Sequence, residues 1–420
     1  MRVLIIGAGI GGLALAQALH AAGIAVAVHD RDPHVAATGG YQLHLDDEAC
    51  AVLRRHLPPS AYEALLASSA NRSSHRRITF TDHRLRPLAQ APIPLDEEML
   101  FVGRVPLRTV LTSGIEDAIT WGSSYVGHEV LENGSVRAHF SDGSTDTADV
   151  LVGADGANSK VAEALAGRPT ASPVGIGGIA GRSPLTPALR SMLPASLSTG
   201  SILGIGPGGT SIFVTPQDTT QGPAVSVGAG ADGERSYARA DQPPFVYWGV
   251  NATLDRLPHA RRDGTAAALS ATDALLKGWS PLIRRLVKDA EPGSVDTFRY
   301  HASDPDAHLT PWSSGPVTAL GDAVHAMPPT GGRAAATAVR DAEALASALI
   351  DASQGTTTIP VAVHEYERAL HAYAGAAIRT SMTPIVWQRR LAKPPMAQLA
   401  RVGTALAAPV LGLRRAATAR

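Results

Sequence analysis

The sequence predicts an α/β fold in which a nucleotide-binding domain built on a parallel sheet is interleaved with a second, mostly antiparallel sheet. Three observations lead to this prediction. The chain opens with a strand, a glycine-rich turn and a helix; three apolar strands far apart in the sequence each end in a glycine-containing turn; and residues 170–242 combine many Gly, Pro, Ser and Thr with short β-type runs. Ligands of open α/β sheets bind at the carboxyl ends of strands. The three turns therefore mark the expected site.

The first thirty residues have the pattern of a dinucleotide-binding unit. Val3–Ile6 is a continuous apolar run, typical of a strand that is buried on both faces. The G-x-G-x-x-G sequence of residues 7–12 follows, and then an Ala- and Leu-rich helix pattern that ends at Gly23. Asp30 comes after a second strand, Ala25–Val28, where a carboxylate can accept hydrogen bonds from a ribose.

Each glycine of this turn has a distinct physical role. Gly7 allows the tight turn, Gly9 lets the backbone approach a pyrophosphate, and Gly12 lets the helix pack closely on the strand. The helix N-terminus supplies free N–H groups and a partial positive charge for the anion. The alternatives are a glycine-rich turn without a ligand, a signal peptide and a membrane span; the four glycines argue against the last two. The residues expected to bind the cofactor here are Gly7, Gly9, Ile10, Gly11, Gly12, Asp30 and Arg31.

Composition limits the class of protein. The 420 residues are 45% hydrophobic and 18% charged, which is ordinary for a globular protein and excludes disorder as the main state. The net charge is zero, so nothing points to nucleic acid. The single cysteine, Cys50, permits no internal disulfide, and without a credible signal peptide we expect a cytoplasmic location. Residues 371–420 carry eight Lys or Arg and no Asp or Glu, and we expect a packed C-terminal helix rather than a membrane anchor.

The first half of the chain continues with shorter elements. After a loop, Tyr41–Leu45 alternates like a strand, and Asp46 or Asp47 is placed to cap a helix that runs to about His56. The expected elements after these are a strand excursion into the second sheet at 76–94, a helix at 106–119, and a β-meander at 125–153 with hairpin turns at Asn133-Gly134 and Asp142-Gly143.

The second half alternates β-type and helical patterns. Strands are expected at 211–215, 224–227, 245–253 and 317–320, and helices at 265–288 (interrupted at Trp279-Ser280-Pro281), 334–350 and 361–381, followed by tail helices broken at Pro384 and later prolines. The predicted division is a Rossmann-like, three-layer nucleotide-binding domain at 1–75, 100–170 and 290–370, a substrate-binding sheet domain at 76–99 and 171–289, and a C-terminal helical segment at 371–420.

The loop motifs together resemble the single-component flavin monooxygenases of the aromatic hydroxylase type, which have the para-hydroxybenzoate hydroxylase fold. The resemblance covers roughly residues 1–375. The motifs that carry it are Gly7-x-Gly9-x-x-Gly12 with Asp30-Arg31, Arg104 in R-x-x-L, Gly153 through Ser159, Gly321 through Pro329, and Arg340-Asp341-Ala342.

This resemblance implies FAD as the cofactor and NAD(P)H as a transient co-substrate. It implies that Asp322 contacts the ribityl or pyrophosphate part of FAD and that Arg104 lies along the FAD groove. It also implies that the helix after Gly331-Gly332 points its N-terminus at the flavin N1/C2 carbonyl, and it associates the Asp155-Gly156 turn with both nucleotides. The implied cofactor-binding residues in this part of the chain are Arg104, Asp155, Gly321, Asp322, Pro329, Gly331, Gly332, Arg333 and Ala334.

The sequence departs from the family pattern in two places. The D-G motif usually ends in Val-Arg, but Val161 is followed by Ala162. The segment after Gly332 is usually Gly-x-Asn, whereas Ala334 and Ala336 stand at those positions here. Alanine forms helices well, so we expect the helix and its dipole to persist.

The resemblance implies a monooxygenase that inserts one oxygen atom from O₂, through a flavin C4a-hydroperoxide, into an aromatic or polyketide-like small molecule. One alternative is a flavin-bound, weakly catalytic protein that sequesters a pathway intermediate, which the alanines after Gly332 support. A flavin halogenase is disfavoured because Tyr247-Trp248-Gly249-Val250 does not match the W-x-W-x-I-P motif. The substrate, the choice of NADH or NADPH, the type of oxygen insertion, the acid–base residue and the oligomeric state stay open.

Several other residues have both a functional and a structural interpretation. His325 is either a base or, more often, a structural residue beside the flavin loop, while Gln42 and His44 are either near the flavin edge or in a core strand. Of Tyr247 and Trp248, at most one faces the cavity. Two further G-x-G-x-x-G matches, at 204–209 and 228–233, are interpreted as turns, and no cluster has metal-ligand spacing.

Overall fold

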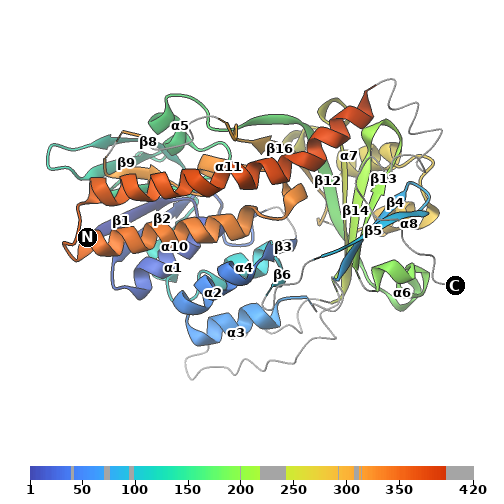
Figure 1. Ribbon diagram of the computed structural model, residues 1–420, viewed down its shortest axis with the longest axis horizontal. Helices are drawn as coiled ribbons and strands as arrows, with labels where there is room; N and C mark the ends of the chain where they lie inside the picture. Colours follow the sequence, from blue (N-terminus) through green and yellow to red (C-terminus); the bar gives the residue numbers. More distant parts are fainter. Residues whose placement is uncertain are drawn as a thin grey trace.

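The computed structural model describes residues 1–38, 42–70, 76–93, 99–198, 200–217, 243–291, 293–306, 312–313 and 315–393. Figure 1 shows two lobes side by side, one built around β1 and β2 and the other around β12 and β14, with the helix α11 running along both. The predicted strand at 224–227, the further G-x-G-x-x-G match at 228–233 and the tail beyond 393 lie outside the described residues.

The first lobe contains a five-stranded parallel sheet in three layers. Its strand order is β17-β11-β1-β2-β7, and every pairing is parallel. Val3 and Ile5 of β1 face the helical layer, whereas Leu4 and Ile6 face the meander. The strand is therefore apolar throughout because both faces are covered. The five strands are β1 Arg2–Ile6, β2 Ala25–Asp30, β7 Ile119–Trp121, β11 Val150–Gly153 and β17 Val317–Ala319.

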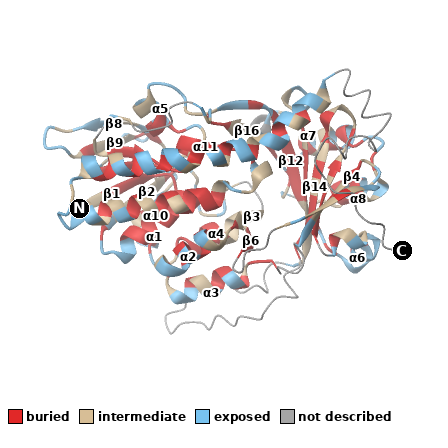
Figure 2. Cartoon of the chain, in the orientation of Figure 1, coloured by how far each residue is buried: buried red, intermediate tan, exposed pale blue. Residues whose placement is uncertain are grey.

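Two long helices cover one face of this sheet. Helix α1 spans Ile10–Ala21, and Gly23 follows it with a φ of 75°, as expected for a helix stop. Helix α10 spans Ala334–Ser353 and packs against α1. Figure 2 shows that the sheet and the inner sides of these helices are buried. The three-layer α/β architecture with a Rossmann-like unit is thus confirmed.

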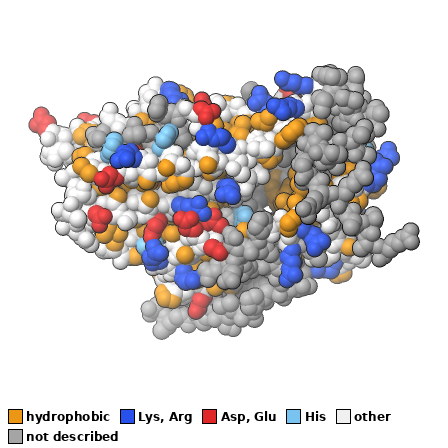
Figure 3. Space-filling view, in the orientation of Figure 1, with side chains coloured by type: hydrophobic (Ala, Val, Ile, Leu, Met, Phe, Trp, Pro, Cys, Tyr) orange, Lys and Arg blue, Asp and Glu red, His pale blue; other side chains and the backbone are white. Residues whose placement is uncertain are grey.

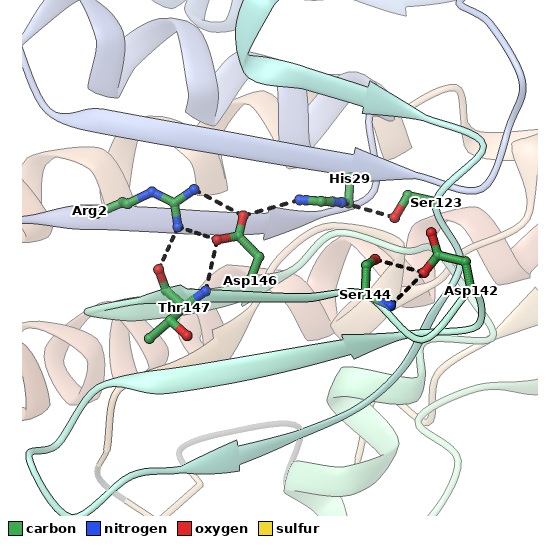
Figure 4. Close-up of polar contacts among 7 residues, drawn as sticks. All are labelled: Arg2, His29, Ser123, Asp142, Ser144, Asp146 and Thr147. Atoms are coloured by element: carbon green, nitrogen blue, oxygen red, sulfur yellow. Dashed lines mark hydrogen bonds and ion pairs between the residues drawn. The ribbon is translucent and has the colours of Figure 1, made fainter.

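A three-stranded meander covers the opposite face. It consists of β8 Tyr125–Val130, β9 Val136–Phe140 and β10 Thr145–Ala148, and both predicted hairpin glycines have positive φ, 84° at Gly134 and 85° at Gly143. The Asp146 carboxylate fixes the meander to the parallel sheet (Figure 4). It accepts two hydrogen bonds from the Arg2 guanidinium, at 2.7 and 2.9 Å, and lies 3.2 Å from Nε2 of His29.

The second lobe contains a seven-stranded sheet of order β16-β12-β15-β14-β13-β4-β5. Its pairings are antiparallel except for β13 with β4. Helices α7 Ala260–Leu275 and α8 Pro281–Lys288 cover one face, where Trp248 and Val250 are buried. The strands are β4 Arg77–Asp82, β5 Pro87–Pro92, β12 Ser172–Pro184, β13 Gly200–Ile205, β14 Ser211–Gln217, β15 Phe245–Thr253 and β16 Asp296–Ala302.

Shorter elements connect the two lobes. The two-stranded antiparallel sheet of β3 Gln42–Leu45 and β6 Leu100–Gly103 lies between them (Figure 1). Asp46 caps α2, as one of the two predicted caps. The remaining helices are α2 Asp47–His56, α3 Pro59–Ala67, α4 Arg104–Val110, α5 Lys160–Ala166, α6 Pro187–Met192, α9 Asp322–His325 and α11 Ile359–Ala392. The 3₁₀ turns are Glu116–Ala118, Ala195–Leu197, Pro207–Gly209, Leu254–Arg256 and Pro329–Gly331.

The predicted helix at 106–119 is wrong in both bounds. Helix α4 begins at Arg104 and ends at Val110, and Ile119 already belongs to β7. The buried Gln17 side chain accounts for the early end, because it donates to the backbone carbonyls of Leu111 and Ser113, at 2.9 and 2.8 Å. Tertiary hydrogen bonds thus stop a helix that local propensity would continue.

The expected helix break at Pro384 is also wrong. Helix α11 continues through Pro384 to Ala392. Pro384 lies on the exposed side, while Ile385 and Gln388 beyond it are buried against the second lobe. Packing therefore offsets the lost backbone hydrogen bond. Two elements cross the predicted domain bounds. Helix α11 continues through residue 370, where the nucleotide-binding domain was expected to end, and β16, which was expected in that domain, joins the second sheet.

Within the described part of the chain, no helix has both the length and the apolar character needed to cross a bilayer.

The His29 contact predicts a pH-dependent stability. Burial lowers the pKa of the His29 imidazole from 6.5, although the Asp146 carboxylate opposes that shift. Because the folded chain favours neutral His29, the unfolded chain binds more protons between the two pKa values, and the free energy of unfolding falls as the pH drops below about 6.5. We expect His29→Gln to flatten this dependence in urea titrations between about pH 7.5 and 5.5. An unchanged slope would contradict this account.

Candidate active site

The three predicted turns lie together at the carboxyl edge of the parallel sheet. Strands β1, β11 and β17 are neighbours, so the turns after Ile6, Gly153 and Leu320 are adjacent. The amide of Ala154 donates to the carbonyl of Ile6 at 2.7 Å, and the amide of Leu320 donates to the carbonyl of Gly153 at 2.9 Å. The structure therefore brings the residues of all three motifs to one edge, where α/β proteins bind nucleotides.

The glycines of the first turn divide into packed and open positions. A Cβ on Gly7 would lie 2.3 Å from the carbonyl oxygen of Ala154, and a Cβ on Gly12 would lie 2.1 Å from the carbonyl oxygen of Gly7. Gly11 packs against Leu320 in the same way. A Cβ on Gly9, in contrast, would meet only one atom, at 3.9 Å. Gly9 thus presents open backbone at the start of α1, where the helix has no side-chain cap.

Arg108 is the main residue of this region that the sequence interpretation missed. Its side chain is 3% exposed and inserts between the glycine turn and the end of β2. The guanidinium donates to the carbonyl of Ala8 at 2.7 Å and pairs with Asp30 and Asp32, at 3.1 and 2.8 Å. It also lies 4.9 Å from the ring centre of Trp121. The only signal for Arg108 in the sequence is its position one helical turn after Arg104.

The Asp30 carboxylate is bound mainly by donors of the protein itself. Its carboxylate accepts hydrogen bonds from the amides of Ala8 and Asp32, at 2.6 and 2.8 Å, in addition to the Arg108 contact. A carboxylate has about four acceptor positions, so one of them remains for a ribose hydroxyl. Arg31 is exposed, and Ile10 is buried in the core of the first lobe.

The charges of Arg104 and Asp322 interact. Burial lowers the pKa of the Arg104 guanidinium, and the Asp322 charge opposes this shift. Burial raises the pKa of the Asp322 carboxyl, with His325 and Arg104 opposing. No donor among the described residues hydrogen-bonds the partly exposed Asp322 carboxylate. A carboxylate in this position is suited to accept hydroxyl groups of a ligand.

Asp155 holds the start of α5. Its carboxylate accepts hydrogen bonds from the Ser159 hydroxyl and from the amide of Lys160, the latter at 2.9 Å. Burial raises the pKa of the Asp155 carboxyl. The neighbouring Gly156 has a φ of 81° and faces open space. The part of this turn that is open to a ligand is therefore its backbone.

The turn at Gly321 is fixed by Asp341 of α10. The completely buried Asp341 carboxylate accepts hydrogen bonds from the Gly321 amide at 2.8 Å, His325 Nε2 at 2.6 Å and the Tyr373 hydroxyl at 2.5 Å. Burial lowers the pKa of His325, but Asp341 outweighs that effect and the net shift is upward. His325 is fully buried, which supports its structural interpretation rather than that of a base.

The loop before α10 lies against α11 and the β3 strand. The Thr330 hydroxyl donates to the Ser381 carbonyl at 2.6 Å, and a Cβ on Gly331 would meet the Ser381 side chain. Gly332 has a φ of 64°, and a Cβ there would lie 3.4 Å from Nδ1 of His44. Pro329 and Arg333 are exposed. Helix α10 begins at Ala334 without a side-chain cap, so its first amides are available to a ligand.

The strand β15 separates Tyr247 from Trp248. Trp248 is fully buried in the core under α7 and α8, and its indole N–H donates to the Ser183 hydroxyl at 3.0 Å. Tyr247 points to the other face, where it contacts the ring of Phe213 at a centroid distance of 6.2 Å. Figure 3 shows hydrophobic side chains gathered where the two lobes meet. The face that carries Tyr247 is thus the one available to a substrate.

These features fit FAD. The open backbone at Gly9 and the uncapped start of α1 suit a pyrophosphate, Arg104 supplies a cation, and Asp322 supplies an acceptor that lacks a protein donor among the described residues. The start of α10 also lacks a side-chain cap, and it follows Gly332, which lies close to His44. Among the described residues, no group of His, Cys, Asp and Glu side chains could hold a metal ion.

Comparisons with known proteins point to the same cofactor. Residues 283–381 match the family described as FAD binding domain, and residues 5–51 match the NAD(P)-binding Rossmann-like domain. A dual O-methyltransferase/FAD-dependent monooxygenase of Cercospora beticola is 29% identical over 94% of this chain and 46% of its own length. The 6-hydroxynicotinate 3-monooxygenase of Pseudomonas fluorescens is 26% identical over 88% of this chain and 87% of its own.

A solved structure covers nearly the whole chain. A candidate FAD-containing monooxygenase from Photorhabdus luminescens is 29% identical, with a TM-score of 0.74 over 96% of this chain and 99% of its own. This chain spans less than half the length of the first curated relatives it matches.

The contrast between Gly9, whose Cβ position is open, and Gly12, whose Cβ position is filled, gives a prediction. Gly9 has a φ of −75° and an open Cβ position, so Gly9→Ala should leave the free energy of unfolding of the apoprotein nearly unchanged. The new methyl group should nevertheless obstruct the pyrophosphate and weaken FAD binding by about tenfold or more. FAD titration of the apoprotein and urea denaturation measure the two quantities.

The matched variant is Gly12→Ala, whose Cβ would overlap the Gly7 carbonyl. Overpacking of this kind costs about 1–3 kcal/mol, so this variant should lose stability as well as FAD affinity. Equal behaviour of the two variants in both measurements would contradict the distinction between open and packed glycines.

Proposed function

We propose that this chain, which is similar to FAD-dependent monooxygenases, is an NAD(P)H-dependent enzyme that inserts one atom of O₂ into an aromatic or polyketide-like small molecule. The observation that carries the proposal is the arrangement at the carboxyl edge of the parallel sheet, where the turns after β1, β11 and β17 are neighbours and where α1 and α10 begin without side-chain caps.

The proposed reaction balances with one oxygen atom in the product and the other in water. NAD(P)H gives up a hydride, which carries two electrons, and becomes NAD(P)⁺; one proton from solvent completes the water molecule. FAD, when bound, supplies the reduction of O₂ and the transfer of oxygen. The protein's task is then to bind the cofactor, orient the substrate and keep water from the reacting atoms.

The residues of this chain divide these tasks along the groove. Gly9 and Arg104 would hold the pyrophosphate, and the Asp322 carboxylate would accept a ribityl hydroxyl. The first amides of α10 would stabilise negative charge on the flavin ring, as a helix N-terminus favours anions. The replacement of glycine and asparagine by Ala334 and Ala336 leaves this helix intact, since Ala336 packs in the core.

The substrate class is proposed from the aromatic surface of the second sheet. Phe213 and Tyr247 are neighbours on the face opposite Trp248, and Gly249 leaves room into which the Tyr247 hydroxyl extends. Planar apolar surfaces of this kind suit a planar aromatic substrate. His44 is a titratable side chain that lies close to Gly332, just before α10. Its ring stacks on Phe101 at a centroid distance of 4.9 Å.

The alternatives have less support. The alternative of a protein that sequesters an intermediate was based on the alanines after Gly332, yet α10 begins there as a regular helix. The relatives named above are described as monooxygenases rather than as carriers. For the halogenase, Tyr247-Trp248-Gly249-Val250 does not match the W-x-W-x-I-P motif, and Trp248 is buried in the core under α7 and α8.

The proposed activity predicts that the FAD-loaded protein oxidises NADH or NADPH faster when a suitable aromatic compound is present. We expect a panel of phenols and polycyclic aromatic ketones to contain at least one compound that raises the oxidation rate by about tenfold or more and gains one ¹⁸O atom from ¹⁸O₂. Mass spectrometry of the product separates oxygen insertion from simple release of peroxide. A yellow protein that neither oxidises NAD(P)H nor forms such a product would refute the proposal.

The Asp322 position predicts a variant with a specific defect. Since no donor among the described residues contacts this carboxylate, Asp322→Ala should not lower the free energy of unfolding of the apoprotein. Hydrogen bonds to charged groups contribute about 1.5–3 kcal/mol, so FAD affinity should fall by about 10- to 100-fold. Calorimetric FAD titration tests this, with Asp155→Ala as the comparison, because Asp155 instead stabilises α5 and its loss should lower stability.

A further inference from the structure

The Asp341 carboxylate joins three separate parts of the first lobe. It is completely buried and accepts its hydrogen bonds from the Gly321 amide, from His325 on α9 and from Tyr373 on α11. A buried carboxylate is stable only when donors surround it. We refer to Gly321, His325, Asp341 and Tyr373 as the Asp341 cluster. Each member depends on the others because they share one acceptor group.

The cluster ends at the turn that presents Asp322 to the groove. Gly321 has a φ of 63° and a ψ of −143°, a conformation that favours glycine. Its amide is held 2.8 Å from one Asp341 oxygen, and the same oxygen accepts from His325. The position of that oxygen therefore fixes the backbone immediately before Asp322.

Tyr373 controls the other oxygen of the same carboxylate. Its hydroxyl donates to Asp341 Oδ1, while Gly321 and His325 donate to Oδ2. Without the hydroxyl, the carboxylate would lack a donor on one side and could rotate away from the Gly321 amide. Tyr373 itself is half-buried on α11 and is absent from the groove residues described above.

We propose that Tyr373, acting through Asp341, is a positioning residue that sets the Gly321–Asp322 turn for FAD. This inference rests on the FAD-binding part of the proposed function. Tyr373 does not touch the cofactor, so its effect passes through the Asp341 cluster. The neighbouring end of α11 is also tied to the flavin loop, because the Thr330 hydroxyl donates to the Ser381 carbonyl. Helix α11 therefore contacts both Asp341 of α10 and the loop that precedes α10.

The chain offers a matched control in Tyr366. It lies seven residues earlier on α11, is 2% exposed, and its hydroxyl donates to the Ala319 carbonyl at 3.1 Å. Ala319 belongs to β17 and is paired with Gly153 in the sheet, so it is held in place without Tyr366. Tyr366→Phe therefore removes a buried tyrosine hydrogen bond from the same helix, one that is made to a paired strand residue rather than to the Asp341 carboxylate.

The experiment compares wild type, Tyr373→Phe and Tyr366→Phe as full-length apoproteins. FAD affinity is measured by calorimetric titration, and the urea midpoint of each apoprotein reports its stability. We expect both variants to lower the urea midpoint, but only Tyr373→Phe to weaken FAD binding, by about tenfold. In an Asp341→Asn background, Tyr373→Phe should add less than about twofold, because the two residues act as one unit.

Two outcomes would overturn the proposal. One is an FAD affinity of Tyr373→Phe equal to that of wild type, and the other is an equal loss of affinity in Tyr366→Phe, which would indicate a general effect of stability. Because the measurement needs no turnover, it is separate from the test of the proposed activity. A protein that binds FAD but oxygenates nothing would remove the proposed activity alone, whereas a wild type without FAD affinity would remove both.

Discussion

The structure depends on the close backbone contact between the ends of two parallel strands, β1 and β11, and the start of α1. Gly12 lies against the carbonyl of Gly7, and Gly7 lies against the carbonyl of Ala154, at distances that leave no room for a side chain. These contacts bring the carboxyl ends of β1 and β11 together and press the start of α1 onto them. Every later feature of the groove, including Arg104 and Asp322, is placed relative to this edge.

The four acids around the groove show how one residue type takes different roles. Asp30, Asp155 and Asp341 each accept several hydrogen bonds from the protein and hold a loop, a helix start and a turn, respectively. Asp322 has no such donor among the described residues, and its charge interacts with the half-buried Arg104. Acids whose acceptors are filled by the chain contribute to folding, whereas an acid without donors is free to contact a ligand.

Local signals in the sequence were sufficient for the elements that depend on local physics. The strand, turn and helix at the N-terminus, the Asp46 cap and the two hairpin glycines could be predicted because their determinants lie within a few residues of each other. Arg108 could not be predicted in its role, since its partners Ala8 and Asp30 are 100 and 78 residues away. The same reason explains the early end of α4, which Gln17 causes, and the continuation of α11 through Pro384, which packing on the second lobe causes. The FAD cofactor follows from the resemblance, and the residues that contact it are a prediction.

Helix α11 has a consequence for how a substrate could enter. Its 34 residues amount to a rod of about 50 Å, fastened to the parallel sheet through Tyr366 and to the second lobe through Gln388. A rod attached at both ends holds the two lobes at a constant separation, so they cannot simply move apart. The remaining freedom is a twist about the axis of the rod or a displacement of surface loops. Access to the interior would therefore open as a turning movement along the length of α11 (Figure 1) rather than as a widening of the molecule.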